Sequence, residues 1–177
     1  KTMEHKNKGI FVAVNIAVLT VSDTRTLAED KSGSVLVERL EEAGHNLVAR
    51  EILKDEIALI AKKFHEWAYN LNIEFIISTG GTGLTGRDVT PEALAQVSEK
   101  DIPGFGELFR MLSYQKIKTS TIQSRASAGV LNGTYIFSLP GSPGACMDAW
   151  DDILVHQLDI RHRPCNFVEL LPRLKEN

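Results

Sequence analysis

Residues 76–95 read IISTGGTGLTGRDVTPEALA, in which an apolar strand leads into a glycine-rich turn and then into a helix start. Glycine has no Cβ atom, so such a turn can reach positive φ and let several backbone N–H groups converge on one anion. Asp88 could hold a metal ion beside that anion. A tight strand-to-helix connection explains the glycines equally well, and the threonines together with Asp88 favour the binding function.

The remaining chain alternates apolar strand patterns with helical ones, which predicts an α/β fold. We expect a three-layer αβα sandwich around a mostly parallel sheet, because parallel strands need helical crossovers on both faces. The predicted strands lie at residues 16–21, 47–53, 75–78 and 134–139, and the predicted helices at 34–43, 56–70, from 90 onward, 105–114 and 145–158.

Two helix starts have a hydroxyl residue followed by proline. Thr90 before Pro91 and Ser142 before Pro143 are predicted N-caps, because the side-chain oxygen accepts an orphan N–H and proline has none to lose. In parallel sheets, ligands bind beyond the carboxyl ends of the strands. The STGGTG turn, the PGSPG turn and the Ser22–Asp23 turn are therefore expected at one edge of the sheet.

Length and composition are those of an ordinary globular protein. The 177 residues suit a single domain, predicted at residues 10–177 after a mobile segment at residues 1–9. With a formal net charge of −3, there is no excess of positive charge for binding nucleic acid or an anionic membrane surface. Neither partner is expected.

The N-terminal lysines before the apolar run at residues 10–21 resemble a secretory signal. Asn15 interrupts that run and no small-residue cleavage site follows, so a buried first strand is the preferred interpretation. No run reaches the roughly 18–20 apolar residues of a membrane span. Cys146 and Cys165 match neither a disulfide framework nor a zinc site, which indicates a reducing, cytoplasmic location.

Several further motifs follow one another in a fixed order along the chain. They are TVSDTR at 20–25, Asp30 with Ser32-Gly33, AGH at 43–45, KDE at 54–56, STGGTG at 78–83, RDVTPEA at 87–93, IPGFGELFR at 102–110, SRA at 124–126 and LPGSP at 139–143. With these motifs the chain resembles the molybdopterin adenylyltransferases, the family of MoaB, MogA and the gephyrin G domain. The tail RPCNF at 163–167 looks most like the MoaB branch.

The resemblance implies a step of molybdenum cofactor biosynthesis, in which molybdopterin is adenylylated by Mg-ATP and pyrophosphate is released. Asp55 and Asp88 match the acidic positions that the family uses for catalysis and for Mg²⁺. The family assembles as trimers, sometimes paired into hexamers. The implied molybdopterin- and nucleotide-binding residues are Ser22, Asp23, Ser78, Thr79, Gly80, Gly81, Thr82, Gly83, Ser124, Arg125, Pro140, Gly141 and Ser142.

Several of these residues also have a structural interpretation that needs no ligand. Asp55 suits an N-cap for the helix predicted from Glu56, and Asp88 suits an Asx-type turn. The guanidinium of Arg125 could hold a phosphate through paired donors, whereas a lone surface arginine is usually solvated.

The sequence departs from the family at Lys54, where many adenylyltransferases have proline.

Three functional hypotheses remain open at this point. The first is an adenylyltransferase, and the second is a non-catalytic molybdopterin-binding carrier or scaffold of the same fold. The third is an unrelated nucleotide-dependent enzyme such as a Rossmann oxidoreductase. It is the weakest, because a dinucleotide fingerprint follows the first strand, whereas this glycine turn follows the third predicted strand.

Overall fold

A six-stranded sheet with the order β2-β1-β3-β6-β5-β4 forms the centre of the molecule, for which a computed structural model describes residues 9–176. The strands are β1 (Asn15–Val21), β2 (Asn46–Leu53), β3 (Phe75–Thr79), β4 (Lys100–Asp101), β5 (Ser127–Leu131) and β6 (Thr134–Leu139). β2, β1, β3 and β6 run parallel, and β5 and β4 complete the sheet in antiparallel pairing. The segment predicted to be mobile lies, apart from Gly9, outside the described residues.

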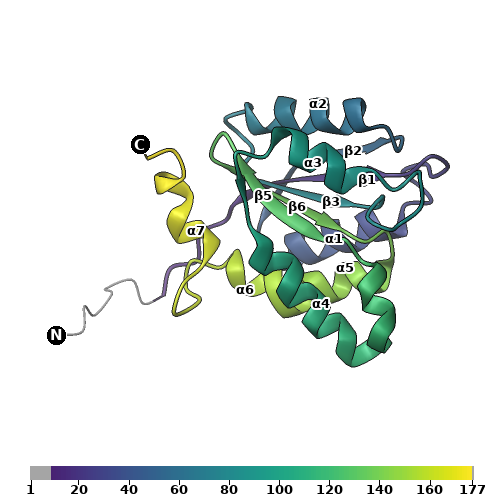
Figure 1. Cartoon of the computed structure of the whole chain (residues 1–177). Helices are drawn as coiled ribbons and strands as arrows, with labels where there is room; N and C mark the ends of the chain where they lie inside the picture. The colour runs from purple at the N-terminus through teal and green to yellow at the C-terminus, as the bar shows by residue number, and fades with distance from the viewer. Residues whose placement is uncertain (1–8, 177) are drawn as a thin grey trace.

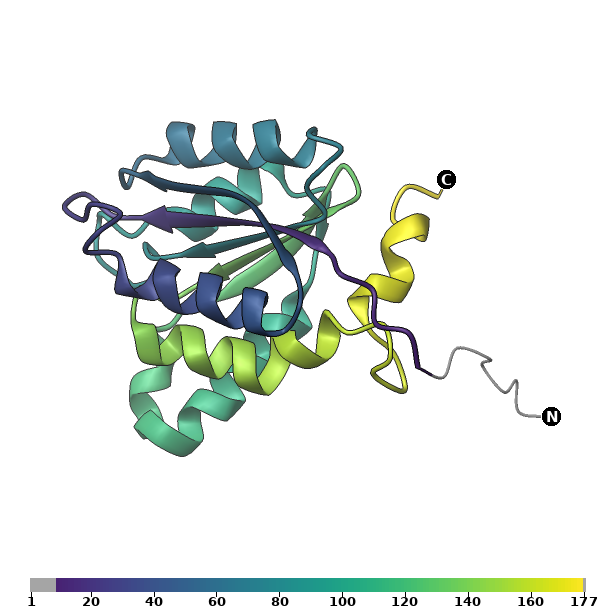
Figure 2. The same cartoon turned by 180° about the vertical axis from the view of Figure 1, so that it is seen from behind.

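Helices cover both faces of this sheet, so the expected three-layer αβα sandwich is confirmed (Figures 1 and 2). The longer helices are α1 (Lys31–Glu42), α2 (Ile57–Ala68), α3 (Thr90–Val97), α4 (Pro103–Ile117) and α5 (Pro143–Ala149), and the shorter ones are α6 (Val155–Gln157) and α7 (Phe167–Leu170). Figure 1 shows α2 and α3 on one face and α1, α4, α5 and α6 on the other. Among the helices of residues 9–176, none combines the length and the apolarity that crossing a bilayer requires.

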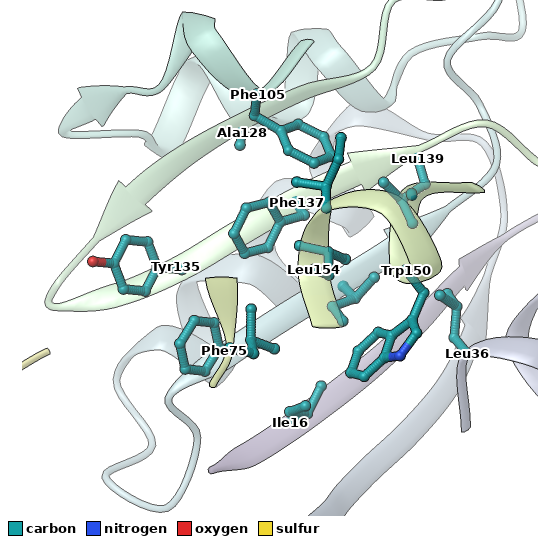
Figure 3. Close-up of a cluster of buried hydrophobic side chains, with 14 of the residues drawn as sticks. Ile16, Leu36, Phe75, Phe105, Ala128, Tyr135, Phe137, Leu139, Trp150 and Leu154 are labelled. Carbon is teal, nitrogen blue, oxygen red and sulfur yellow. The ribbon is translucent and has the colours of Figure 1, made fainter. Parts of the chain in front are cut away.

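Successive side chains along each strand point to opposite faces of the sheet and therefore pack into two separate hydrophobic cores. On β1, Ile16 and Val18 pack toward α1 and α5, whereas Ala17 and Leu19 pack toward α2. The larger core is rich in aromatic rings, and Figure 3 shows Phe75, Tyr135, Phe137 and Trp150 among them. Phe75 and Tyr135 stack across neighbouring parallel strands with ring centroids 5.1 Å apart. This packing holds the parallel strands in the register that brings their carboxyl ends together.

One prediction for a helix start needs correction. Thr90 is the first residue of α3 and not its N-cap, because its hydroxyl donates to the carbonyl of Gly80 at 2.9 Å and leaves the helix end without a side-chain cap. The helical character predicted at residues 145–158 is confirmed, since α5, a π-helical segment at Trp150–Leu154 and α6 follow one another without a break. The prediction for Ser142 is confirmed, since its Oγ accepts from the N–H of Ala145.

The sequence prediction also missed β4 and β5, and it placed the start of α1 too late. β5 begins with the small residues Ser127, Ala128 and Gly129, which give no strand pattern of their own, and it forms because β6 pairs with it. α1 begins at Lys31 because the Asp30 carboxylate accepts from the N–H of Gly33 at 2.9 Å and caps the helix.

Candidate functional site

Three turns meet at the carboxyl ends of the parallel strands, as the sequence predicted. A methyl group added to Gly80 would lie 2.2 Å from the carbonyl oxygen of Val21, and one added to Gly141 would lie 3.1 Å from the Cα atom of Gly80. The Thr79 hydroxyl also donates to the carbonyl of Pro140 at 2.8 Å. The turns that follow β1, β3 and β6 are therefore in direct backbone contact.

A pocket of about 390 Å³ opens at this junction. Its lining brings together predicted residues from the glycine turn, the SRA motif and the PGSPG turn; they are Gly81, Thr82, Gly83, Asp88, Ser124, Pro140, Gly141 and Ser142. Gln123 also lines the pocket and was missed by the sequence analysis. Only its position directly before Ser124 could have indicated that it lies in the pocket.

Thr90 fixes the first half of the glycine turn. Its hydroxyl donates to the carbonyl of Gly80 at 2.9 Å, and its backbone N–H donates to the carbonyl of Gly81 at 3.0 Å. In a trans peptide the carbonyl and the following N–H point in opposite directions. Two carbonyls tied to the start of α3 therefore turn the N–H groups of Gly81 and Thr82 away from that helix.

Arg125 fixes the second half of the same turn. Its backbone N–H donates to the carbonyl of Thr82 at 3.0 Å, and its Nε donates to the carbonyl of Gly83 at 2.8 Å. The guanidinium also donates to the carbonyl of Asp88 at 2.8 Å and pairs with the carboxylate of Glu92. The donors of Arg125 therefore stabilise the turn and are not available to a ligand in the pocket.

With its carbonyls held by Thr90 and Arg125, the turn has few backbone N–H groups left for a ligand. The N–H of Gly80 donates to the carbonyl of Leu139 at 3.0 Å, so it is already used. Within residues 9–176, the N–H groups of Gly81 and Thr82 make no hydrogen bond to the protein. Two adjacent free amides in a turn with left-handed φ at Gly80 and Gly81 form the kind of concavity that binds anions.

Asp55 lies against the glycine turn from the β2 side. A methyl group on Gly81 would lie 2.9 Å from its Oδ1 atom. The helix-cap interpretation does not hold, because Glu56 is the N-cap residue of α2 and no side chain caps that end. Burial raises the pKa of Asp55, and the negative charges of Asp23 and Asp88 raise it further. A cation placed among these carboxylates would relieve that repulsion.

Asp88 lies against the end of the glycine turn, since a methyl group on Gly83 would lie 2.8 Å from its Oδ2 atom. The same Oδ2 accepts from the N–H of Thr85 at 2.9 Å and from its hydroxyl at 2.7 Å. Burial opposes ionisation of Asp88, yet the hydrogen bonds from Thr85 and Gly83 outweigh it and lower the pKa of Asp88. The local turn therefore keeps this carboxylate charged at the mouth of the pocket.

Asp23 links the β1 turn to both of these loops. Its carboxylate accepts from Arg87 Nε at 2.9 Å and Nη2 at 2.8 Å, and also from the backbone N–H of Asp55 at 3.2 Å. The hydrogen bond from Arg87 lowers the pKa of Asp23. Arg87 thus has a role that the sequence analysis did not assign, although it stands next to Asp88 in the motif.

Other predicted site residues make internal contacts. Ser78 is buried, and its hydroxyl donates within the sheet to the carbonyl of Phe137 at 3.2 Å. Thr79 is also buried, and its hydroxyl donates to the carbonyl of Pro140. The Ser22 hydroxyl accepts from the N–H groups of Thr24 and Arg25 in its own turn. The structure does not bring these three hydroxyls to the pocket.

The carboxylates suit a magnesium ion that arrives with phosphate. Within residues 9–176, no group of three or more histidine, cysteine, aspartate or glutamate side chains could enclose a metal ion. Mg²⁺ does not need such a cage, since it is usually bound by one or two carboxylates together with substrate phosphates and water. Asp55 beside Gly81 and Asp88 beside Gly83 could provide the hard oxygen ligands for such an arrangement.

The chain is similar to known proteins over most of its length. Residues 17–160 match the family model described as a probable molybdopterin binding domain. The chain is 47% identical over 157 residues to molybdenum cofactor biosynthesis protein B of Escherichia coli K12, covering 89% of this chain and 92% of that protein.

Two solved structures are similar to the molecule over most of its length. A crystal structure of a molybdenum cofactor biosynthesis protein B matches with a TM-score of 0.81 and 41% identity, covering 83% of this chain and 92% of that one. The tungsten cofactor synthesizing protein MoaB from Pyrococcus furiosus matches with a TM-score of 0.72 and 33% identity, covering 80% and 91%.

Proposed function

Because the chain belongs to the MoaB and MogA family of molybdopterin-binding proteins, we propose that it transfers the adenylyl group of Mg-ATP to molybdopterin. In this reaction a phosphate oxygen of molybdopterin forms a bond to the α-phosphorus of ATP, and the bond from that phosphorus to the β-phosphate oxygen breaks. Adenylylated molybdopterin and pyrophosphate are the products. The observation that carries the proposal is that Asp55 lies against Gly81 and Asp88 against Gly83, in the turn that holds two free backbone amides.

Each part of the site has a task in this reaction. The N–H groups of Gly81 and Thr82 can donate to a phosphate oxygen whose negative charge increases at the transition state. Thr90 and Arg125 keep the turn rigid by holding its carbonyls, so these donors need little reorganisation. Asp55 and Asp88 would hold Mg²⁺, which supplies positive charge to offset the repulsion between the reacting phosphates.

A non-catalytic molybdopterin-binding protein of the same fold is the alternative. Such a protein would need the pocket and the amides but would gain nothing from two carboxylates beside a bound phosphate, because their charges repel it. Burial and neighbouring acidic groups already raise the pKa of Asp55. This unfavourable placement favours the enzyme, in which a cation accompanies the substrate.

An adenylyl-transfer assay tests the proposal. We expect the protein to convert molybdopterin and Mg-ATP to adenylylated molybdopterin with one pyrophosphate per product, and we expect removal of Mg²⁺ by a chelator to stop the reaction. The control is molybdopterin binding measured by calorimetry without ATP. Binding of molybdopterin without formation of product would favour the non-catalytic alternative and contradict the proposal.

Four features implied by the resemblance and the sequence remain predictions for this chain. They are the trimeric or hexameric assembly, the cytoplasmic location, the role of residues 10–177 as one independent domain, and the use of Mg²⁺ with ATP. The two cysteines are free, with Cys146 buried and Cys165 exposed, as a reducing compartment would allow.

A further inference from the structure

A second pocket, of about 410 Å³, lies beside the candidate site at the carboxyl ends of β1 and β2. Three cationic residues line it, namely Arg25, Arg50 and Lys54. Asp23 and Glu51 are the acidic residues of the lining. The resemblance assigns no function to Arg50 or Lys54, and Lys54 is a position at which this chain departs from the family.

The acidic charges of this pocket are neutralised by residues outside it. Asp23 pairs with Arg87 at 2.8 Å, and Glu51 pairs with Lys63 at 3.0 Å. Neither Arg25 nor Lys54 forms an ion pair with any residue in the described range 9–176. The pocket therefore keeps two uncompensated positive charges.

Arg50 adds an unsatisfied donor to these charges. Its Nη2 pairs with the fully buried carboxylate of Asp30 at 3.2 Å and donates to the Ser34 hydroxyl at 2.9 Å. Its Nε is buried and, among residues 9–176, has no hydrogen-bond partner. A buried donor without a partner costs free energy unless a ligand or water satisfies it.

The second pocket adjoins the first. Arg25 lines the second pocket, and its Nη1 donates to the carbonyl of Gly141, which lines the first. Asp23 also lines the second pocket and accepts from the N–H of Asp55, the residue that borders the glycine turn. One extended anion could therefore contact the free amides of the turn and the cations of the second pocket.

We propose that Arg25, Lys54 and Arg50 bind the β- and γ-phosphates of the nucleotide and then the pyrophosphate formed from them. The assignment of this anion to ATP rests on the proposed function. When the bond between the α-phosphorus and the β-phosphate oxygen breaks, its electron pair leaves with pyrophosphate, which becomes more negative. Two free cations and one free donor fit this polyanion, because charge-assisted hydrogen bonds to phosphate are the strong ones.

Calorimetric titration with inorganic pyrophosphate, ATP and AMP tests this inference directly. Lys54→Met and Arg25→Met are each expected to weaken binding of pyrophosphate and ATP by about tenfold, the change that loss of one such charged contact produces. AMP lacks the β- and γ-phosphates, so its affinity should stay unchanged. Lys54→Arg should restore binding of pyrophosphate, because it restores the charge.

The matched control is Lys62→Met, which removes the same charge from an exposed position on α2. Unchanged affinity for pyrophosphate in Lys54→Met and Arg25→Met, or equal losses for AMP and pyrophosphate, would overturn the inference. These results are independent of the adenylyl-transfer assay. A protein that fails that assay and still binds pyrophosphate through Lys54 would refute the proposed function alone.

Discussion

Asp88→Asn is expected to lower the rate of adenylyl transfer by about a hundredfold or more. The amide keeps the shape of the side chain and can still accept from Thr85, whose N–H and hydroxyl lie 2.9 and 2.7 Å from Oδ2. It removes the negative charge that would hold Mg²⁺ beside the substrate phosphates. Loss of one group that stabilises charge at a transition state typically costs about 10²–10³ in rate. The measurement is the single-turnover rate with molybdopterin and saturating Mg-ATP.

Asp152→Asn provides the matched control, because Asp152 is exposed on the π-helical segment away from the glycine turn. It should leave the rate unchanged. If Asp88→Asn kept more than half of the wild-type rate while folding normally, Asp88 would have no part in catalysis. Asp88 would then serve only to stabilise the turn through its hydrogen bonds with Thr85.

Gly80→Ala is expected to lower the free energy of unfolding by about 3 kcal/mol, a large effect for one methyl group. The new Cβ atom would lie 2.2 Å from the carbonyl oxygen of Val21, a backbone atom that cannot move without shifting β1. Gly80 also has φ of +104°, which L residues rarely adopt. Urea denaturation followed by circular dichroism measures the change.

Gly86→Ala is the matched substitution in the same turn. No heavy atom lies within 4 Å of the position its Cβ would take, and its φ is not left-handed. Its free energy of unfolding should change by less than about 0.5 kcal/mol. If both substitutions had the same small effect, the close contact between the turns after β1 and β3 would not exist in solution.

The sequence predicted the layers and the edge at which the site lies for identifiable reasons. β1, β3 and β6 are mostly apolar, buried runs, and β6 was predicted with the bounds that the structure has, Thr134–Leu139. Since parallel strands end at one edge, the positions of the three turns followed from topology alone. β5 could not be predicted in the same way, because its small residues become a strand only by pairing with β6.

Within the site, the sequence indicated the residue types but not their contacts. The motif suggested that Arg125 faces a ligand, whereas its guanidinium donates to the carbonyls of Gly83 and Asp88. The ion pair between Asp23 and Arg87 joins residues 64 positions apart. Such contacts depend on the relative placement of two loops, which no local pattern encodes.

Whether Asp55 and Asp88 hold a divalent cation can be seen in a crystal of the protein with a non-hydrolysable ATP analogue and Mn²⁺ in place of Mg²⁺. Anomalous scattering locates the ion without reference to any mechanism. We expect a peak bound by the carboxylates of Asp55 and Asp88, or by water molecules that they hold, with the α-phosphate on the amides of Gly81 and Thr82. A peak elsewhere, or carboxylates turned away from an ion bound only by phosphate, would contradict this expectation.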